Sequence, residues 1–274
     1  MTELGELPEG CIAVILSRTT PLDVGRLSLV STTFNSAAKF NDVWNRFLPS
    51  DPHLISSTIS QCPSLANNPS KKALFLAMSD SPIIIDNGRK SFQLERKSGK
   101  KCYMLSARSL TIAGIDDIYS WYWTDTPDSR FTEVANIRFL RWLEIRGMIN
   151  TTSLSPNTQY AAYLVFKTIH AYGFDKCPVV LSVGVEGGHI DTKIVCLDPN
   201  VQRRPSNRRF NHTLVGLPRP SVRSDGWLEI EMGEFFNSGI EDENIQMNVI
   251  EIMSGMMKAS FSLEGIEVRP KVDN

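Results

Sequence analysis

The sequence lacks an excess of charge of either sign. Its 274 residues carry 29 Lys and Arg against 30 Asp and Glu, which gives a net charge of −1. Nucleic-acid binding depends on a basic surface, because the release of counterions from phosphates supplies much of the affinity. A generally basic nucleic-acid binder is therefore excluded. The basic run at 203–209 is the one dense local patch, and two interpretations remain open: a solvated loop, or a surface for nuclear localisation or an acidic partner.

Closely spaced cysteines and long apolar runs are also missing. The five cysteines are odd in number and include no C-x-x-C pair, and a chain of this length does not need disulfides. We therefore expect reduced thiols and a location in the cytoplasm or nucleus. Apolar runs such as 11–16 and 73–78 are far too short for a membrane span, and residues 1–9 lack the pattern of a signal peptide. No membrane insertion is expected.

The motifs of common active sites are absent. The four histidines are dispersed, and none pairs with Cys or His at the spacing of metal ligands. The glycines at 184–188 lack the Lys-Ser/Thr that completes a phosphate-binding loop, and neither G-x-S-x-G nor H-E-x-x-H occurs. We expect no metal, no cofactor and no catalytic centre in this chain. The 42% hydrophobic content nevertheless suffices for a folded core.

The first fifty residues show the spacing of short helices. Pro8 is tolerated in a first helical turn, and apolar residues then fall on one face, namely Ile12, Ile15 and Leu16. A second helix is predicted to start at 20–23, where Thr, Pro and Asp occupy their preferred N-terminal positions. A third helical piece follows at 34–40, and an apolar cluster surrounds Trp44. Such short helices bury their apolar faces poorly alone, so they either dock on the rest of the chain or bind a partner.

The periodicity changes from helical to alternating after residue 83. Residues 49–100 are predicted to be a linker with one helix at 70–78 and a hairpin, because turn sequences at 86–88 and 98–100 flank a strand. Further strands are predicted at 138–145, 159–167, 179–186, 227–232, 247–253 and 260–268. No strand–helix–strand rhythm separates them, which favours an antiparallel sandwich or jelly roll. Trp142 and Trp227 lie in these strands and are expected in the core. The chain as a whole is predicted to be α+β.

The N-terminal pattern resembles an F-box over roughly residues 4–48, and residues 1–48 are assigned to that domain. The order of anchors matches: Leu-Pro-Glu at 7–9, Pro-Leu-Asp at 21–23, Leu-Val-Ser at 29–31 and Val-Trp at 43–44. The resemblance implies docking on a Skp-type adaptor, and through it on a cullin and a RING-bearing ubiquitin ligase. Apolar side chains would supply the affinity. The implied adaptor-binding residues are Leu7, Pro8, Ile12, Ile15, Leu16, Pro21, Leu22, Leu29, Val30 and Trp44.

The remainder, residues 101–271, resembles the phloem-protein-2-like domain of plants, to which the lectin Nictaba belongs. The resemblance rests on ordered blocks, which are KCYMLSAR at 101–108, SRFTEVA at 129–135, WLEIRG at 142–147, LSPNTQYAAY at 154–163, DGWLEIE at 225–231 and GIEVRP at 265–270. It implies an all-β, lectin-like sandwich that binds N-acetylglucosamine oligomers and the cores of N-glycans.

The resemblance also implies a sugar site built from two tryptophans and acidic side chains, since an indole stacks on a sugar face and carboxylates accept hydrogen bonds from its hydroxyl groups. The second tryptophan aligns with Trp121, but the first aligns with Gly114. Trp123 is a candidate substitute, although both tryptophans also fit a core role. The acidic candidates are Glu231 and Glu234, for which a solvated strand end is the alternative.

Together the two resemblances imply a non-catalytic, substrate-recognition subunit of an SCF-type ubiquitin ligase. Its target would be a glycoprotein or another protein. The alternative is a stress-responsive lectin that acts without the ligase. Glycan binding by the isolated second domain would favour the lectin hypothesis, and binding of a Skp-type adaptor would favour the ligase hypothesis.

Overall fold

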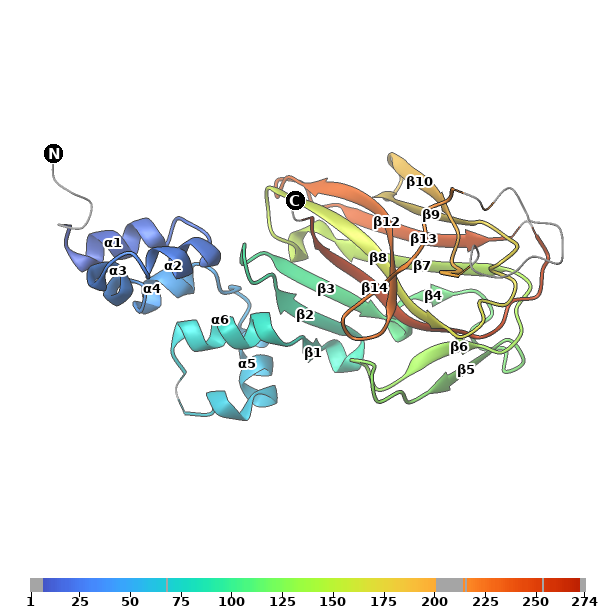
Figure 1. The fold of residues 1–274 in the computed structure, drawn as a ribbon, viewed down its shortest axis with the longest axis horizontal. Helices are drawn as coiled ribbons and strands as arrows, with labels where there is room; N and C mark the ends of the chain where they lie inside the picture. Colours follow the sequence, from blue (N-terminus) through green and yellow to red (C-terminus); the bar gives the residue numbers. More distant parts are fainter. Residues whose placement is uncertain (1–6, 68, 201–213, 215, 253, 272–274) are drawn as a thin grey trace. The chain divides into compact units, whose positions relative to one another are not determined.

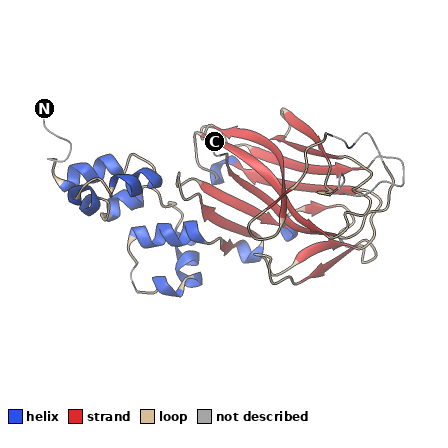
Figure 2. Ribbon diagram, in the orientation of Figure 1, coloured by secondary structure: helices blue, strands red, loops and turns tan. Residues whose placement is uncertain are grey.

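The computed structural model describes residues 7–67, 69–200, 214, 216–252 and 254–271 (Figure 1). The predicted basic run at 203–209 lies outside these residues. The chain divides into two compact units, the first comprising Met1–Ile85 with Ser91–Cys102 and the second comprising Asp86–Lys90 with Tyr103–Asn274. Helices dominate the first unit and strands the second (Figure 2), so the fold is α+β as predicted.

The first unit consists of short helices followed by a hairpin. The helices are α1 (Glu9–Leu16), α2 (Pro21–Leu27), α3 (Thr32–Ala37), α4 (Asn41–Asn45), α5 (Pro52–Gln61) and α6 (Lys71–Asp80), and the first strands are β1 (Ile83–Ile85) and β2 (Lys90–Leu94). Helix α2 starts as its sequence predicts, because the Thr20 hydroxyl accepts a hydrogen bond from the Asp23 backbone N–H at 3.2 Å and donates to its carboxylate at 2.8 Å. Ser31 caps α3 in the same way through the backbone N–H of Phe34. The apolar cluster around Trp44 forms a helix of its own, α4.

Most of the segment predicted as a linker, residues 49–85 and 91–100, is part of the same compact unit as the N-terminal helices. The ring of Phe75 on α6 lies 5.3 Å from that of Trp44 on α4, and Phe47 completes the aromatic cluster. The Trp44 indole N–H donates to the carbonyl of Ala38 at 2.6 Å. In addition, the backbone N–H of Leu22 donates to the carbonyl of Lys97 in the loop after β2. Helix α4 therefore packs directly on α6, and α2 is hydrogen-bonded to the loop after β2, so this following segment extends the core of the N-terminal helices.

The second unit consists of two antiparallel sheets. Its strands are β3 (Lys101–Ser106, which enters this unit at Tyr103), β4 (Thr111–Ile112), β5 (Trp121–Thr124), β6 (Val134–Ile137), β7 (Leu143–Asn150), β8 (Thr158–Thr168), β9 (Val179–Val185), β10 (Ile190–Val195), β11 (Ser221–Val222), β12 (Leu228–Asn237), β13 (Asn244–Glu251) and β14 (Phe261–Pro270). One sheet has the order β3-β14-β8-β12-β11, with β6 also paired to β14 and β5 paired to β6. The other has the order β10-β9-β13-β7-β4.

The chain crosses between these sheets after β3, β4, β6, β7, β8, β10, β12 and β13, so that β3-β14-β8-β12 faces β7-β13-β9-β10. This is the connectivity of a jelly roll, which the sequence predicts as one of two options. The sheets approach closely. A Cβ atom added to Gly147 on β7 would lie 3.2 Å from the side chain of Ile266 on β14. The stacked rings of Phe166 and Phe261, 4.9 Å apart, belong to the buried core of this unit.

The structure corrects one expectation about the core tryptophans. Trp227 is fully buried as predicted. Trp142, however, is 51% exposed, because residues 138–142 form a loop and the strand predicted at 138–145 begins only at Leu143. The apolar side chains at 138–145 suggest a strand, but in the loop at 138–142 two of them, Phe139 and Trp142, are exposed.

The packing of α6 on α4 leads to a test of the first unit. Phe75→Ala removes a fully buried ring and should lower the free energy of unfolding of this unit by about 3–5 kcal/mol, since the surrounding rings cannot close the cavity. Urea unfolding followed by the helical circular dichroism signal measures the loss. Phe40→Ala is the matched control, because the Phe40 ring is exposed and its removal should cost less than about 1 kcal/mol. Equal losses for the two variants would contradict a shared core.

Candidate functional site

The predicted adaptor-binding residues divide into a buried and an exposed group. Four of them are buried inside the first unit and support its core: Ile12, Leu16, Pro21 and Trp44. Leu7 and Leu22 are half-buried. The exposed group comprises Pro8, Ile15, Leu29 and Val30, to which the structure adds Val14, a residue that the motif did not single out. Direct contact with a partner is open to the exposed group, while the buried residues act by shaping the helices that carry it.

Leu29 and Val30 are the most exposed of these side chains, at 85% and 69%. They occupy the turn between α2 and α3, where the Val30 backbone N–H donates to the Leu27 carbonyl and Ser31 caps the next helix. Two adjacent aliphatic side chains are thus held in water by a hydrogen-bonded turn. An apolar pair on a rigid turn favours insertion into an apolar groove of a partner.

The predicted sugar-binding tryptophans do not present free faces. Trp121 is 2% exposed, and its indole N–H donates to the carbonyl of Ala113 at 3.2 Å, so it belongs to the core of the second unit. The guanidinium of Arg108 lies 3.6 Å from the ring centre of Trp123, and the same group binds the carboxylate of Glu133. Burial of Trp121 argues against a stacking role, and a sugar would have to displace Arg108 to reach that face of Trp123.

Gly114, which stands where the resemblance places the first tryptophan, also has an unusual backbone conformation. Its backbone lies at φ +70°, a conformation that residues with a Cβ rarely adopt, and no atom lies within 4 Å of the position of an added Cβ. A Cβ atom would therefore meet no neighbour, but the backbone conformation does not favour a residue that carries one.

The acidic candidates lie elsewhere on the sheet. Glu231 on β12 pairs with Lys193 at 2.8 Å, and Glu234 pairs with Lys271, whose hydrogen bond lowers the pKa of the Glu234 carboxyl. Strand β5, which carries the tryptophans, reaches β12 only through β6, β14 and β8. Four strand spacings amount to roughly 19 Å. The structure therefore does not bring Trp121, Trp123, Glu231 and Glu234 into one site, and sugar contact by any of them stays a prediction.

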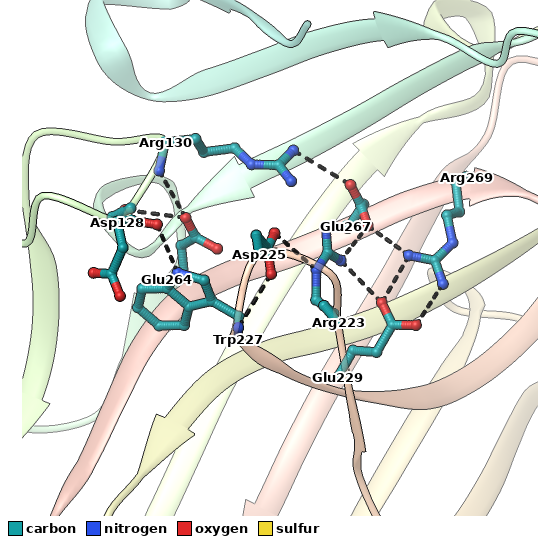
Figure 3. Close-up of polar contacts among 10 residues, drawn as sticks. Asp128, Arg130, Arg223, Asp225, Trp227, Glu229, Glu264, Glu267 and Arg269 are labelled. Atoms are coloured by element: carbon teal, nitrogen blue, oxygen red, sulfur yellow. Dashed lines mark hydrogen bonds and ion pairs between the residues drawn. The ribbon is translucent and has the colours of Figure 1, made fainter. Parts of the chain in front are cut away.

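A dense group of charged side chains, which sequence reasoning missed, lies on the first sheet (Figure 3). The carboxylate of Glu267 on β14 accepts from Arg223 at 2.6 Å, from Arg269 at 2.7 Å and from Arg130 at 3.3 Å. Glu229 on β12 binds both Arg223 and Arg269. The only hint in the sequence is the recurrence of acidic and basic residues in the blocks at 225–231 and 265–270. We call Arg130, Arg223, Glu229, Glu267 and Arg269 the arginine–glutamate network.

Electrostatics within this network favour the ionised states of Glu267, Arg223 and Arg269. Burial alone would raise the pKa of Glu267, but the positive charges of Arg130 and Arg223 outweigh it and lower that pKa from 4.5 to about 2. Burial likewise opposes the charge of Arg223, yet the neighbouring carboxylates of Glu267, Asp225 and Glu229 raise its pKa. Because each buried charge depends on its partners, the removal of one leaves the others uncompensated.

The loops around the network are attached by further hydrogen bonds. The Trp227 indole N–H donates to the carbonyl of Asp128 at 2.9 Å, and Lys167 lies 4.5 Å above the Trp227 ring (Figure 3 shows the indole). Glu264 accepts from the Ser129 hydroxyl at 3.0 Å and from the Arg130 backbone N–H at 2.9 Å, while burial raises the pKa of its carboxyl. These hydrogen bonds fasten the loop of Asp128–Arg130 to Glu264 on β14 and to Trp227.

The described part of the chain also bears on metal sites and membrane-spanning helices. No group of three or more His, Cys, Asp or Glu side chains in it could hold a metal ion. In the same residues, no helix has the length and apolar character that a membrane crossing requires.

The lowered pKa of Glu267 predicts how stability depends on pH. Its folded pKa of about 2 lies below the usual 4.5, so its stabilising contribution is complete above about pH 4.5 and is lost as the pH falls toward 2. Glu267→Gln should therefore cost about 3 kcal/mol at neutral pH, and less as the solution is acidified. Urea unfolding of both proteins at several pH values measures this difference. A loss that does not vary with pH would contradict the prediction.

Glu264→Gln provides the matched control on the same strand. Its carboxyl is also buried, but its pKa is raised, so ionisation opposes folding as the pH rises through the usual range of a carboxyl. The glutamine oxygen can accept the same two hydrogen bonds. This variant should gain stability relative to the natural chain as the pH increases, the opposite sign to Glu267→Gln.

The sequence matches two protein families. Phloem protein 2 matches residues 100–270, and the F-box domain matches residues 4–46. The putative F-box protein PP2-B12 of Arabidopsis thaliana is 42% identical over 271 residues, which cover 97% of each chain. F-box protein PP2-B10 of the same plant is 38% identical, over 96% of this chain and 92% of the relative, and F-box protein VBF is 40% identical, over 97% and 99%. With both domains matched in order and the relatives aligned over nearly their whole length, this chain belongs to the family of plant F-box proteins that carry a phloem protein 2 domain.

Proposed function

We propose that this chain is the target-recognition subunit of an SCF-type ubiquitin ligase. The first unit binds a Skp-type adaptor, and through it a cullin and a RING-bearing ligase. The second unit binds a target, which is a glycoprotein or another protein. The chain supplies no catalytic group and acts by position: it raises the concentration of the target's lysines near the charged conjugating enzyme.

One observation carries this proposal, namely the exposure of Leu29 and Val30 within the segment that matches the F-box domain. Burial of the pair against a partner would remove two large apolar side chains from water, each worth about 1.5–3 kcal/mol when fully buried. The hydrogen bonds of the turn hold both side chains in place before binding, so little conformational entropy is lost on association. These features agree with an apolar docking site of modest size.

A cytoplasmic or nuclear location is part of the proposal. All five cysteines are free thiols in the structure, and two of them, Cys177 and Cys196, are buried. Free thiols are typical of proteins in reducing compartments.

The lectin alternative has less support. The residues predicted to bind sugar lie on strands that are far apart in the sheet, and Trp121 is buried. We therefore do not extend the proposal to glycan recognition, and the target's recognised feature is taken to be part of a protein.

The exposed pair on the α2–α3 turn provides the test. Replacement of both residues, Leu29→Asp with Val30→Asp, should weaken binding of a purified Skp-type adaptor to the full chain at least tenfold, because two carboxylates would enter an apolar groove. The fold should survive, since both side chains are exposed. Pull-down and titration with the adaptor measure binding, and circular dichroism verifies folding.

Val222→Asp is the matched control, because Val222 is 73% exposed on β11 of the second unit and receives the same substitution as Val30. Its adaptor affinity should equal that of the natural chain. If the natural chain fails to bind the adaptor, or if the double variant binds as tightly as the natural chain, the proposed function is wrong.

A further inference from the structure

Three loops meet at one end of the jelly roll. They follow β6, β8 and β13, and their residues 138–142, 169–172 and 256–257 are called the loop surface below. Leu140 and Lys258 form an isolated antiparallel bridge, with backbone hydrogen bonds of 3.0 and 2.7 Å in the two directions. The backbone N–H of Ala259 donates to the carbonyl of Tyr172 at 3.2 Å, which joins the remaining loop. The three loops therefore form one connected surface.

A buried lysine, Lys258, holds two of these loops together through hydrogen bonds to their backbone carbonyls. Lys258 is fully buried, and its ammonium group donates to the carbonyls of Arg141 at 2.9 Å and Met256 at 3.0 Å while it pairs with the carboxylate of Glu251. Burial would raise the pKa of Glu251, but the hydrogen bond from Lys258 outweighs this effect and lowers it. Gly173 also packs tightly, because an added Cβ would lie 2.2 Å from the Met257 carbonyl oxygen. The buried hydrogen bonds of Lys258 and the close packing at Gly173 therefore hold these loops in place.

Large apolar side chains point into water from these anchored loops. Phe139 is 59% exposed and Trp142 is 51% exposed, and they are joined by Ile169, Tyr172 and Met257. Phe139 and Ile169 line a hollow of about 590 Å³ together with Tyr122. Aromatic residues, methionine and arginine are the types enriched at protein–protein interfaces. A set of this size, fixed by buried hydrogen bonds, is typical of a preformed binding surface.

The charges of the loop surface indicate the chemistry of its partner. Arg138 lies over the ring of Tyr122, at 4.8 Å from its centre, and Arg141 is exposed. Within the described residues, neither arginine has a carboxylate partner, whereas Lys167 pairs with Asp128 and Lys258 with Glu251. Two uncompensated positive charges beside apolar side chains favour a ligand with carboxylates.

The hollow is better suited to a polypeptide than to a sugar. Two polar residues that line it, Asn136 and Ser262, already form hydrogen bonds within the protein. The Ser262 hydroxyl donates to the Asn136 side-chain oxygen at 2.5 Å, and the Asn136 amide donates to Thr124 at 2.9 Å. A sugar would need such groups for its hydroxyls. The apolar side chains of Phe139 and Ile169, which line the hollow, instead match apolar side chains of a protein.

We propose that the loop surface docks a segment of a target protein that combines acidic and apolar side chains, with the apolar ones against Phe139 and Trp142 and the carboxylates against Arg138 and Arg141. This inference rests on the proposed function, because it names the part of the second unit that holds the target. Loops fixed before binding would let a short segment bind without a large cost in ordering them.

Selection from defined peptide pools tests the inference. The natural full chain is incubated with two bead-displayed pools of the same length, one randomised over Asp, Glu, Leu, Phe and Ser, the other over Lys, Arg, Leu, Phe and Ser. The acidic pool should yield bound peptides, and Phe139→Ala or Arg138→Glu should weaken their binding at least tenfold. Arg138→Lys should keep most of the affinity. Phe236→Ala is the matched control, since Phe236 is 60% exposed at the far end of β12 and its loss should change nothing.

Several results would overturn the inference: no enrichment from the acidic pool, equal enrichment from the basic pool, or equal binding by Phe139→Ala and Phe236→Ala. Binding of an oligogalacturonide, an anionic sugar, in place of the acidic peptides would assign the surface to carbohydrate and also overturn it. The same preparations are titrated with the Skp-type adaptor. Adaptor binding without peptide selection removes only this inference, and peptide selection without adaptor binding removes only the proposed function.

Discussion

The second unit depends on one buried carboxylate, that of Glu267. It lies on β14, which pairs with β3, β6 and β8 and so connects most of its sheet. Three arginines converge on it, and two of them also bind Glu229 on β12. Each buried ion pair here contributes little net free energy to folding, because the cost of desolvating the two charges offsets much of their attraction. The network instead restricts geometry, since the segments that carry Arg130 and Arg223 must both lie within reach of Glu267 for these charges to be paired.

Much of the fold follows from local sequence. The Thr20 cap, the short helices and most of the long strands are where their residue patterns predict, and the absence of a strand–helix–strand rhythm correctly indicated antiparallel sheets. The strand prediction was wrong at 138–142, because closely spaced apolar residues occur both in a buried strand and in a loop that exposes them. Trp142 is therefore on the surface, and nothing in its neighbours' identities distinguishes the two cases.

The site residues were harder to predict, for a physical reason. A motif marks which residues recur, but burial decides what each can touch. Ile12 and Leu16 appear in the same motif as Leu29, yet the first two lie in the core and the third lies in water. The arginine–glutamate network joins residues from four separate segments, and the contact between Arg130 and Glu267 spans most of the domain's sequence. No local spacing could have predicted that contact.

Gly114 has a consequence for any redesign of this surface. The carbonyl of the preceding residue, Ala113, accepts the Trp121 indole N–H, so the turn at Gly114 also helps to hold Trp121 in the core. A tryptophan introduced at position 114 alone would therefore not create a pair of exposed indoles. The turn would have to be reshaped and Trp121 removed from the core as well.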